Sequence, residues 1–166
     1  MIKLVKRKFT QQEWFDILMN FQDLNLMQTW EFAQAKSIIY SWRVERFIFQ
    51  DGENIIGALQ ALVKPMPIIG GGLVWINQGP LWRRSAKGDF SLFIKMLKEI
   101  SRYWVERQHF YVRIAPPIFN KKQFTEEVES IGYNLVGKSP GWSSEKLDLF
   151  KTKEQLRKQF KQKWRT

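Results

Sequence analysis

Apolar and polar positions follow two different periods along this 166-residue chain. Residues 2–6 alternate apolar with basic side chains, which predicts a short edge strand. Thr10 and Glu13 have the spacing of a capping box and predict the start of a helix. A second helix is predicted after Thr29, over residues 30–39, where few residues oppose helix. The chain therefore begins with a strand and two short helices.

The next segment predicts a hairpin and a buried strand. Residues 42–50 and 55–64 flank a four-residue turn that contains Gly52, and glycine between β-rich runs is typical of a hairpin. The second run is nearly all apolar, so we expect that strand to be buried on both faces in the middle of a sheet. After a stretch rich in proline and glycine, residues 73–76 predict a third strand.

Helical periodicity is strongest in residues 89–108, where apolar side chains form one stripe and charged side chains face elsewhere. Residues 110–115 predict a strand, which ends at two prolines. Residues 124–131 predict a further helix, with Gly132 in the position that follows a helix C-terminus.

The rest of the chain predicts two strands and a basic helix. The strands are expected at residues 133–136 and 146–150. The last helix is predicted to begin at Thr152, with Gln155 at capping-box spacing. Its apolar face consists of Leu156, Phe160 and Trp164.

The predicted order is β, α, α, β, β, β, α, β, α, β, β and a basic helix. This order resembles the GNAT N-acyltransferase fold, an α/β (α+β) fold with a central, mixed but mostly antiparallel sheet and helices on both faces. We expect residues 1–150 to form a GNAT-like domain. We expect residues 151–166 to form a basic C-terminal helix, the start of a second domain that this sequence does not include.

The amino-acid composition excludes several kinds of functional site. Hydrophobic residues make up 44% of the chain and charged residues 26%, which indicates an ordered globular domain. The absence of cysteine excludes disulfides, thiolate zinc sites and a cysteine nucleophile. His109 is the only histidine, so we interpret it as an ordinary loop or core residue and predict no metal site. No signal peptide or membrane span is predicted, so we expect a cytoplasmic protein whose contact with membranes is peripheral at most.

Positive charge is concentrated at the end of the chain. The net charge is +11, and +6 of it lies in residues 151–166. Such a segment can bind tRNA phosphates through counterion release. Alternatively, its apolar face packs on neighbouring protein and its charges face solvent.

Neither of two phosphate-binding patterns is predicted to function in this chain. Residues 132–139 match the P-loop pattern G-x-x-x-x-G-K-S, but a P-loop follows a strand and precedes a helix, whereas here a helix precedes and a strand lies inside. GNAT acetyltransferases hold the CoA pyrophosphate on a Gln/Arg-x-x-Gly-x-Gly/Ala loop after the fourth strand. Residues 77–88 take that place here, but Pro80 has no N–H and the glycine spacing fails. We therefore predict no cofactor.

Several motifs together resemble the first domain of FemABX-type peptidoglycan-bridge aminoacyltransferases. The matching stretches are LMQTWEFAQAK at 26–36 followed by Trp42, IGALQ at 56–60, GLVWINQGP at 72–80, LDL at 147–149, TKEQLRKQF at 152–160 and KWR at 163–165. This resemblance implies the transfer of an amino acid from aminoacyl-tRNA to an amine of a peptidoglycan precursor. Such a transfer needs positioning, charge stabilisation and proton removal, but no enzyme nucleophile, metal or CoA.

The resemblance also implies partners. The chain is expected to be the acceptor-binding, N-terminal half, holding UDP-MurNAc-peptide or its lipid-linked form. Aminoacyl-tRNA is expected to bind through the missing second domain and the basic tail, and no DNA partner is expected.

Five residues are candidate substrate contacts, and no catalytic residue is assigned. Lys36 stands where the family has a lysine that contacts the precursor's diphosphate; otherwise it is a solvated helix residue. Trp75, Gln78 and Gly79 are predicted to line the precursor groove; their alternative role is strand packing and a tight turn. Arg83 stands where the family often has an acidic residue, and it meets anionic substrate groups or simply faces solvent.

Two other functions stay open. One is an acyl-CoA-dependent GNAT N-acetyltransferase with a degenerate loop. The other is a non-catalytic tRNA- or protein-binding module that acts through its basic tail.

Overall fold

The computed structural model of the chain describes residues 2–66, 68, 70–84, 89–116, 122–136 and 150–159. The chain divides into two compact units, Met1–Asn134 and Leu135–Thr166. The second unit contains α5 (Lys153–Gln159). The first unit contains β1 (Ile2–Lys6), α1 (Gln11–Leu18), η1 (Leu26–Gln28), α2 (Trp30–Tyr40), β2 (Arg43–Asp51), β3 (Asn54–Met66), β4 (Gly71–Asn77), α3 (Phe90–Ile100), η3 (Ser101–Glu106), β5 (Phe110–Ala115) and α4 (Lys122–Glu129).

Five described strands form one mixed sheet in the order β1-β2-β3-β4-β5. The first four strands are antiparallel, and β5 runs parallel to β4. β1 lies at an edge and the nearly all-apolar β3 lies in the middle, as their sequences predict. The hairpin turn between β2 and β3 contains Gly52 with a φ of +60°, a conformation that glycine adopts without strain.

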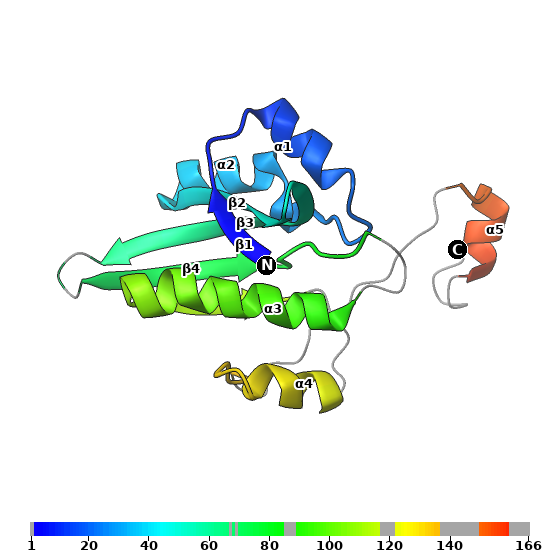
Figure 1. Ribbon diagram of the computed structural model, residues 1–166. Helices are drawn as coiled ribbons and strands as arrows, with labels where there is room; N and C mark the ends of the chain where they lie inside the picture. Colours follow the sequence, from blue (N-terminus) through cyan, green and yellow to red (C-terminus); the bar gives the residue numbers. More distant parts are fainter. Residues whose placement is uncertain are drawn as a thin grey trace. The chain divides into compact units, whose positions relative to one another are not determined.

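Helices cover both faces of the sheet: α1 and α2 lie on one side and α3 on the other (Figure 1). The capping box predicted at Thr10 is present, and Thr29 caps the second helix. Glu13 N–H donates to the Thr10 hydroxyl over 3.2 Å, and the Glu13 carboxylate accepts from Thr10 N–H over 2.7 Å. The Thr29 hydroxyl accepts from Phe32 N–H over 3.4 Å at the start of α2. Local sequence therefore sets where these two helices begin.

Each face of the sheet has its own apolar core. The core under α3 includes Phe47, Val63 and Ile76, while the core under α1 includes Trp14 and Ile48. Alternate residues of β2 thus point to opposite faces, and both faces are buried.

The predicted helix at 89–108 is two elements rather than one. The α-helix α3 ends at Ile100, and η3 continues as a π-helical turn. Ile100 and Trp104 are both fully buried. The apolar stripe is compatible with either winding, because both windings place residues four or five positions apart on nearly the same face.

One predicted strand is wrong. Residues 133–136 follow α4 and Gly132 without forming a strand. The Tyr133 hydroxyl donates to the Leu97 carbonyl over 3.0 Å, while Leu135 and Val136 are exposed. Because only Tyr133 meets the core, the segment has no apolar face that would hold it in a sheet.

The end of the chain is described only in part. Of the strand predicted at 146–150, residues 146–149 lie outside the described residues, and Phe150 lies in a turn. The predicted capping box of the last helix is present: Thr152 N–H donates to the Gln155 side-chain carbonyl over 2.9 Å, and Gln155 N–H donates to the Thr152 hydroxyl. Phe160 and Trp164 lie outside the described residues. Among the helices that the structure describes, none is long and apolar enough to cross a membrane.

The core under α3 should depend strongly on Trp104. This side chain is fully buried, and its ring meets Phe47 edge-on with 4.8 Å between ring centroids. We expect Trp104→Ala to lower the free energy of unfolding by about 3–5 kcal/mol in urea titrations, because it leaves a large cavity. The control Val105→Ala, at an exposed position of the same turn, should change it by less than about 0.5 kcal/mol. Equal effects of the two substitutions would contradict this packing.

Candidate functional site

A buried glutamine lies between two strands of the sheet. β3 and β4 pair from Leu62 and Trp75 outward, but their ladder ends there. Gln28 is fully buried in the gap. Its Nε2 donates to the Gln60 carbonyl over 3.2 Å and to the Asn77 carbonyl over 2.8 Å, and its Oε1 accepts from Gln60 N–H over 2.8 Å. The side-chain amide thus makes the hydrogen bonds that the other strand would have made.

The chain after β4 bends around this amide. A Cβ atom on Gly79 would lie 2.7 Å from Gln28 Nε2, so a larger residue here would push the Gln28 amide out of its hydrogen bonds. The chain then returns to β3, where Ala58 and Leu81 exchange two backbone hydrogen bonds of 3.0 and 2.8 Å. Gly79 therefore allows the loop that follows β4 to pass close to Gln28.

Gln60 extends the buried polar network to a cation. Its Nε2 donates to the Thr29 carbonyl over 2.7 Å, and its Oε1 accepts from Arg46 Nε over 2.8 Å. The Arg46 guanidinium lies 3.6 Å from the centroid of the Trp30 ring. Burial lowers the pKa of Arg46 to about 10, partly opposed by the Glu31 carboxylate, so this side chain stays protonated at neutral pH.

Two segments that are far apart in the sequence are bonded together here. We call residues 22–28 the docking segment and residues 78–84 the β4 loop. Asn25 Nδ2 donates to the Gln78 carbonyl over 2.8 Å, and Gln22 N–H donates to the Arg83 carbonyl over 2.8 Å. The β4 loop is therefore positioned by the docking segment as well as by the sheet.

Asp23 makes the most consequential of these contacts. Its two carboxylate oxygens accept from Trp82 N–H and Arg83 N–H, each over 3.2 Å. Burial raises the pKa of Asp23, while the two N–H donors oppose that rise. Adjacent backbone N–H groups form an anion-binding site in many proteins. In this chain an internal carboxylate already occupies it.

The structure places three of the five predicted contacts in the β4 loop. Gln78 has a φ of +48°, and its N–H donates to the Ala115 carbonyl over 2.7 Å. Gly79 packs on Gln28, as described above. Arg83 lies with its guanidinium 5.3 Å from the Trp82 ring centroid.

The other two predicted residues lie elsewhere. Lys36 is half-buried on α2, with its ammonium 4.6 Å from the Tyr40 ring centroid and 5.5 Å from that of Phe32. Trp75 lies on β4, where its ring meets Trp42. Within the described ranges, no hydrogen bond, ion pair or ring contact joins Lys36 to Trp75 or to the β4 loop residue Gln78.

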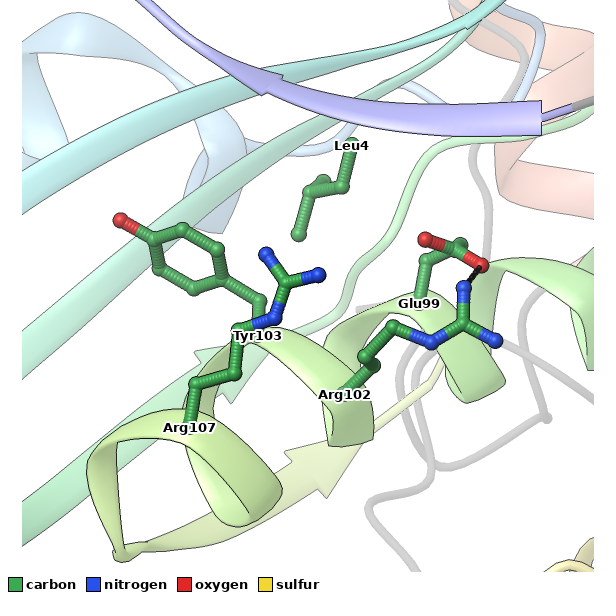
Figure 2. Close-up of a pocket in the computed structure, with 5 residues that line it drawn as sticks. All are labelled: Leu4, Glu99, Arg102, Tyr103 and Arg107. Atoms are coloured by element: carbon green, nitrogen blue, oxygen red, sulfur yellow. Dashed lines mark hydrogen bonds and ion pairs between the residues drawn. The ribbon is translucent and has the colours of Figure 1, made fainter.

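The opposite face of the sheet has a small polar pocket. Figure 2 shows it between β1 and the α3–η3 helix, where Arg102 pairs with Glu99. Its volume is about 40 Å³, which suits roughly one water molecule rather than a substrate. Its lining residues are Leu4, Glu99, Arg102, Tyr103 and Arg107.

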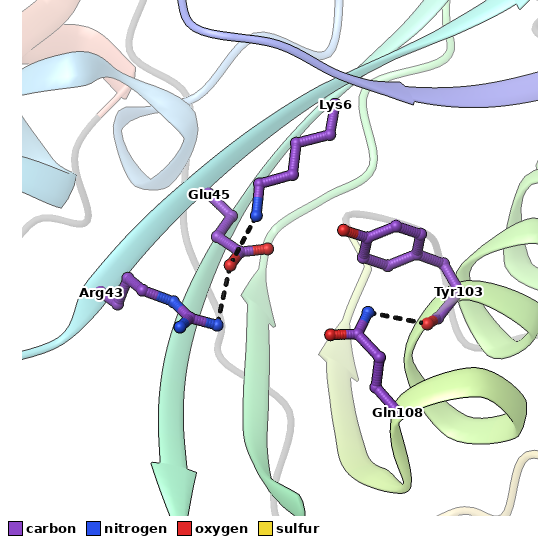
Figure 3. Close-up of polar contacts among 5 residues, drawn as sticks. All are labelled: Lys6, Arg43, Glu45, Tyr103 and Gln108. Atoms are coloured by element: carbon purple, nitrogen blue, oxygen red, sulfur yellow. Dashed lines mark hydrogen bonds and ion pairs between the residues drawn. The ribbon is translucent and has the colours of Figure 1, made fainter.

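A buried carboxylate on the same face lies beside two cations. Glu45 is 5% exposed, and one of its oxygens lies 2.8 Å from Lys6 Nζ and 2.9 Å from Arg43 (Figure 3). A buried charge with two opposite charges beside it is stabilised where it is. We therefore assign Glu45 to the folding of β1 against β2.

The single histidine of the chain lies between η3 and β5. His109 is exposed with a φ of +58°, and its N–H donates to the Val105 carbonyl. In the part of the chain that the structure describes, no group of three or more histidine, aspartate or glutamate side chains is placed to hold a metal ion.

Sequence reasoning missed Asp23 and Gln28 as organising residues. Gln28 lay inside a motif that was recognised, but nothing local distinguished its amide. Gln60 could have indicated this network. A glutamine in an otherwise apolar, central strand must find buried hydrogen-bond partners.

Comparisons with solved structures define the class of the fold. FemX superposes on this chain with a TM-score of 0.58 and 21% identity, over 84% of this chain and 34% of FemX. A probable acetyltransferase superposes with a TM-score of 0.52 and 11% identity, over 88% of this chain and 99% of that protein. The mixed sheet with helices on both faces is thus the GNAT-like α/β fold that the element order predicts. The chain spans about a third of the length of FemX.

The family follows from the sequence match. The FemAB family model matches residues 9–166, which is nearly the whole chain. This protein therefore belongs to the FemAB family, as its motifs predicted. A comparison with curated proteins found no match.

Removing the Gln28 amide should destabilise the protein. Gln28→Leu leaves the Gln60 and Asn77 backbone groups buried without their partners, so we expect a loss of about 2–4 kcal/mol in the free energy of unfolding. Gln34→Leu, at an exposed position of α2, is the matched control and should change it by less than about 0.5 kcal/mol. If Gln28→Leu were as stable as the control, the proposed hydrogen bonds would be wrong.

Asp23 should make stability depend on pH in a defined direction. Because its pKa is raised in the folded protein, the folded state holds its proton at pH values where the unfolded state has lost it, and stability falls as pH rises from the ordinary value of 3.8. Urea titrations should therefore show the wild type losing stability relative to Asp23→Asn as pH rises from about 3 to about 7. A gain relative to Asp23→Asn over this range would contradict the burial of the carboxylate.

Proposed function

We propose that this chain is the acceptor-binding, GNAT-like domain of an aminoacyltransferase that moves an amino acid from aminoacyl-tRNA to an amine of a peptidoglycan precursor. The observation that supports the proposal most strongly is that the backbone N–H groups of the β4 loop are already hydrogen-bonded within the protein. In acyl-CoA-dependent GNAT enzymes this loop offers backbone N–H groups to the CoA pyrophosphate. Here Trp82 N–H and Arg83 N–H are bound by Asp23, and Pro80 has no N–H.

The electrostatics of the loop support the same conclusion. A pyrophosphate brought to the N–H groups of Trp82 and Arg83 would meet the Asp23 carboxylate, and like charges at close range repel. Membership of the FemAB family favours a reaction in which the acyl group arrives as an ester of tRNA. An acyl-CoA-dependent N-acetyltransferase is therefore the less favoured alternative.

The reaction depends on positioning the two substrates rather than on covalent catalysis. The precursor's amine attacks the carbonyl carbon of the aminoacyl ester, a C–N bond forms and the C–O bond to the tRNA breaks. The proton lost by the amine ends on the tRNA oxygen, which leaves as a hydroxyl. A domain that holds the precursor firmly lowers the entropic part of this barrier. The β4 loop, fixed by Gln28, Asp23 and Asn25, supplies a rigid surface for this purpose.

Positive side chains fit the anionic part of such a precursor. Lys36 is half-buried among aromatic rings, where a charge is screened less than in open solvent. Arg84 is exposed and lies 5.6 Å from the Phe21 ring centroid. We assign Lys36 to the diphosphate, and Arg83 with Trp75, Gln78 and Gly79 to the remainder of the acceptor site.

Calorimetry tests the proposal directly. UDP-MurNAc-pentapeptide should bind this chain, and Lys36→Ala should weaken its binding about 10-fold or more, because a hydrogen bond to a charged group is lost. Lys98→Ala removes an equal charge from the exposed side of α3 and should leave the affinity within about 2-fold.

Acetyl-CoA provides the decisive comparison. Acetyl-CoA that bound more tightly than the precursor, together with an unchanged affinity in Lys36→Ala, would replace this proposal by the acyl-CoA alternative.

A further inference from the structure

The end of the sheet where β3 leads into β4 carries exposed apolar side chains. Ile68 lies between the two strands and is fully exposed, and Met66 at the end of β3 is exposed as well. The last turn of α2 presents Ile38 and Ile39, which are 75% and 66% exposed. Among the described large apolar side chains of Met1–Asn134, Ile68 and Ile38 are the two most exposed. We call Ile38, Ile39, Met66 and Ile68 the apolar end.

The sheet register brings these two segments to the same end of the first unit. α2 ends shortly before Arg43, and Arg43 pairs with Val63 near the end of β3. Trp42 connects the two segments, because its ring centroid lies 5.6 Å from Lys64 Nζ. In Figure 1 the ends of β3 and β4 that meet at this hairpin extend past α2. The apolar end therefore projects from the sheet.

Close backbone packing holds the base of the hairpin. Met66 pairs with Gly71 across the two strands. A side chain at Gly71 would collide with the His109 carbonyl, and a side chain at Gly72 would collide with the Lys64 carbonyl. The sheet thus fixes how the exposed side chains are presented, so binding through them does not require the strands to rearrange.

Positive charge accompanies the apolar side chains. Lys64 is exposed and shares a face of β3 with Met66, because alternate residues of a strand point to the same side. Arg43 is exposed, and it shares the buried Glu45 carboxylate with Lys6, so two cations face one anion. Among the described residues, no ion pair includes Lys64. This end of the sheet is therefore both apolar and basic.

We propose that the apolar end docks on an anionic lipid bilayer, with Ile68 inserted among the lipids. Lys64 and Arg43 then lie beside the headgroups. Apolar side chains that project beside cations gain both burial in the bilayer and attraction to anionic lipid. Trp42 and Tyr40 each have an apolar body and a polar tip, which suits the level of the headgroups. A folded protein partner would need a separate pocket for each projecting side chain, whereas a bilayer accommodates them all.

Docking at this end goes beyond the transfer reaction and does not require it. The hairpin lies at the start of β4, and the β4 loop follows the other end of that strand. The docking contacts are therefore separate from the β4 loop, and they do not include Lys36. On a bilayer, the domain would be held close to any acceptor that is carried on lipid.

Co-sedimentation of the whole chain with vesicles tests the docking. The chain should bind vesicles of equimolar phosphatidylcholine and phosphatidylglycerol, and should bind phosphatidylcholine alone at least about 10-fold more weakly, because the cations need anionic lipid. Ile68→Asp should weaken binding to the mixed vesicles about 10-fold, since a charge replaces the inserted apolar side chain. Lys64→Gln should weaken it about 5-fold.

A matched control separates docking from general stickiness. Met19 is 61% exposed and follows α1. Its neighbour Phe21 lies 5.6 Å from the Arg84 guanidinium of the β4 loop, away from the hairpin. Met19→Asp should therefore bind the mixed vesicles like the wild type.

A fluorescent label reports insertion directly. The chain has no cysteine, so Ile68→Cys and Met19→Cys each create a single labelling site. An environment-sensitive fluorophore at residue 68 should shift to the blue when mixed vesicles are added, because it enters an apolar medium. The same fluorophore at residue 19 should not shift.

Several results would overturn the docking. They are no binding to the mixed vesicles, equal binding by Ile68→Asp and Met19→Asp, or no fluorophore shift at residue 68. Binding that persists in Ile68→Asp and disappears at high salt would assign vesicle binding to basic residues elsewhere in the chain. A dimer that Ile68→Asp dissociates in the ultracentrifuge, without vesicle binding, would assign the apolar end to a second copy.

Docking and the proposed function can fail separately. Ile68→Asp should bind the water-soluble UDP-MurNAc-pentapeptide like the wild type, because Ile68 is not part of the acceptor site. A chain that binds this precursor but no vesicles would lose the docking and keep the proposed function. A chain that binds vesicles but not the precursor would keep the docking and lose the acceptor site.

Discussion

The hydrogen bonds of one buried amide determine how this domain is built around its loop. Strands β3 and β4 part beyond Leu62 and Trp75, and the backbone groups left in the gap are buried. Unpaired groups of this kind are costly, so the gap can exist only if something satisfies them. Gln28 does so, bonded to Gln60 and Asn77 at once.

The form of the β4 loop follows from that insertion. The chain after Asn77 passes the amide at Gly79, where a side chain would collide with it, and returns to β3 at Leu81. The segment that carries Gln28 also carries Asn25 and Asp23, and both bind the loop. In this way the arrangement of the strands, the path of the loop and the occupation of its N–H groups have a common origin. The acceptor site proposed for this FemAB-family domain depends on the β4 loop being held in this conformation.

Much of the fold could be predicted because its signals are local. The capping residues Thr10 and Thr29, the turn at Gly52 and the nearly all-apolar β3 each depend on neighbours within a few positions. The role of Gln28 could not be predicted, because its partners lie 32 and 49 residues away. The strand expected at 133–136 failed for a related reason: its residues favour strands locally, but only Tyr133 has a place in the core. The motif at residues 72–80 made Trp75, Gln78 and Gly79 candidate contacts, and that role stays a prediction. The contacts of Trp75 with Trp42 and Arg113 could not be predicted, because they depend on the register of the sheet.

The internal carboxylate of Asp23 holds the N–H groups of Trp82 and Arg83 and so closes the β4 loop to a pyrophosphate. NMR of the amide resonances during a titration with acetyl-CoA tests this contact. We expect the Trp82 and Arg83 amides to be protected from hydrogen exchange in the free protein and not to shift as acetyl-CoA is added. Fast exchange at both amides, or a saturable shift of both by acetyl-CoA, would contradict it.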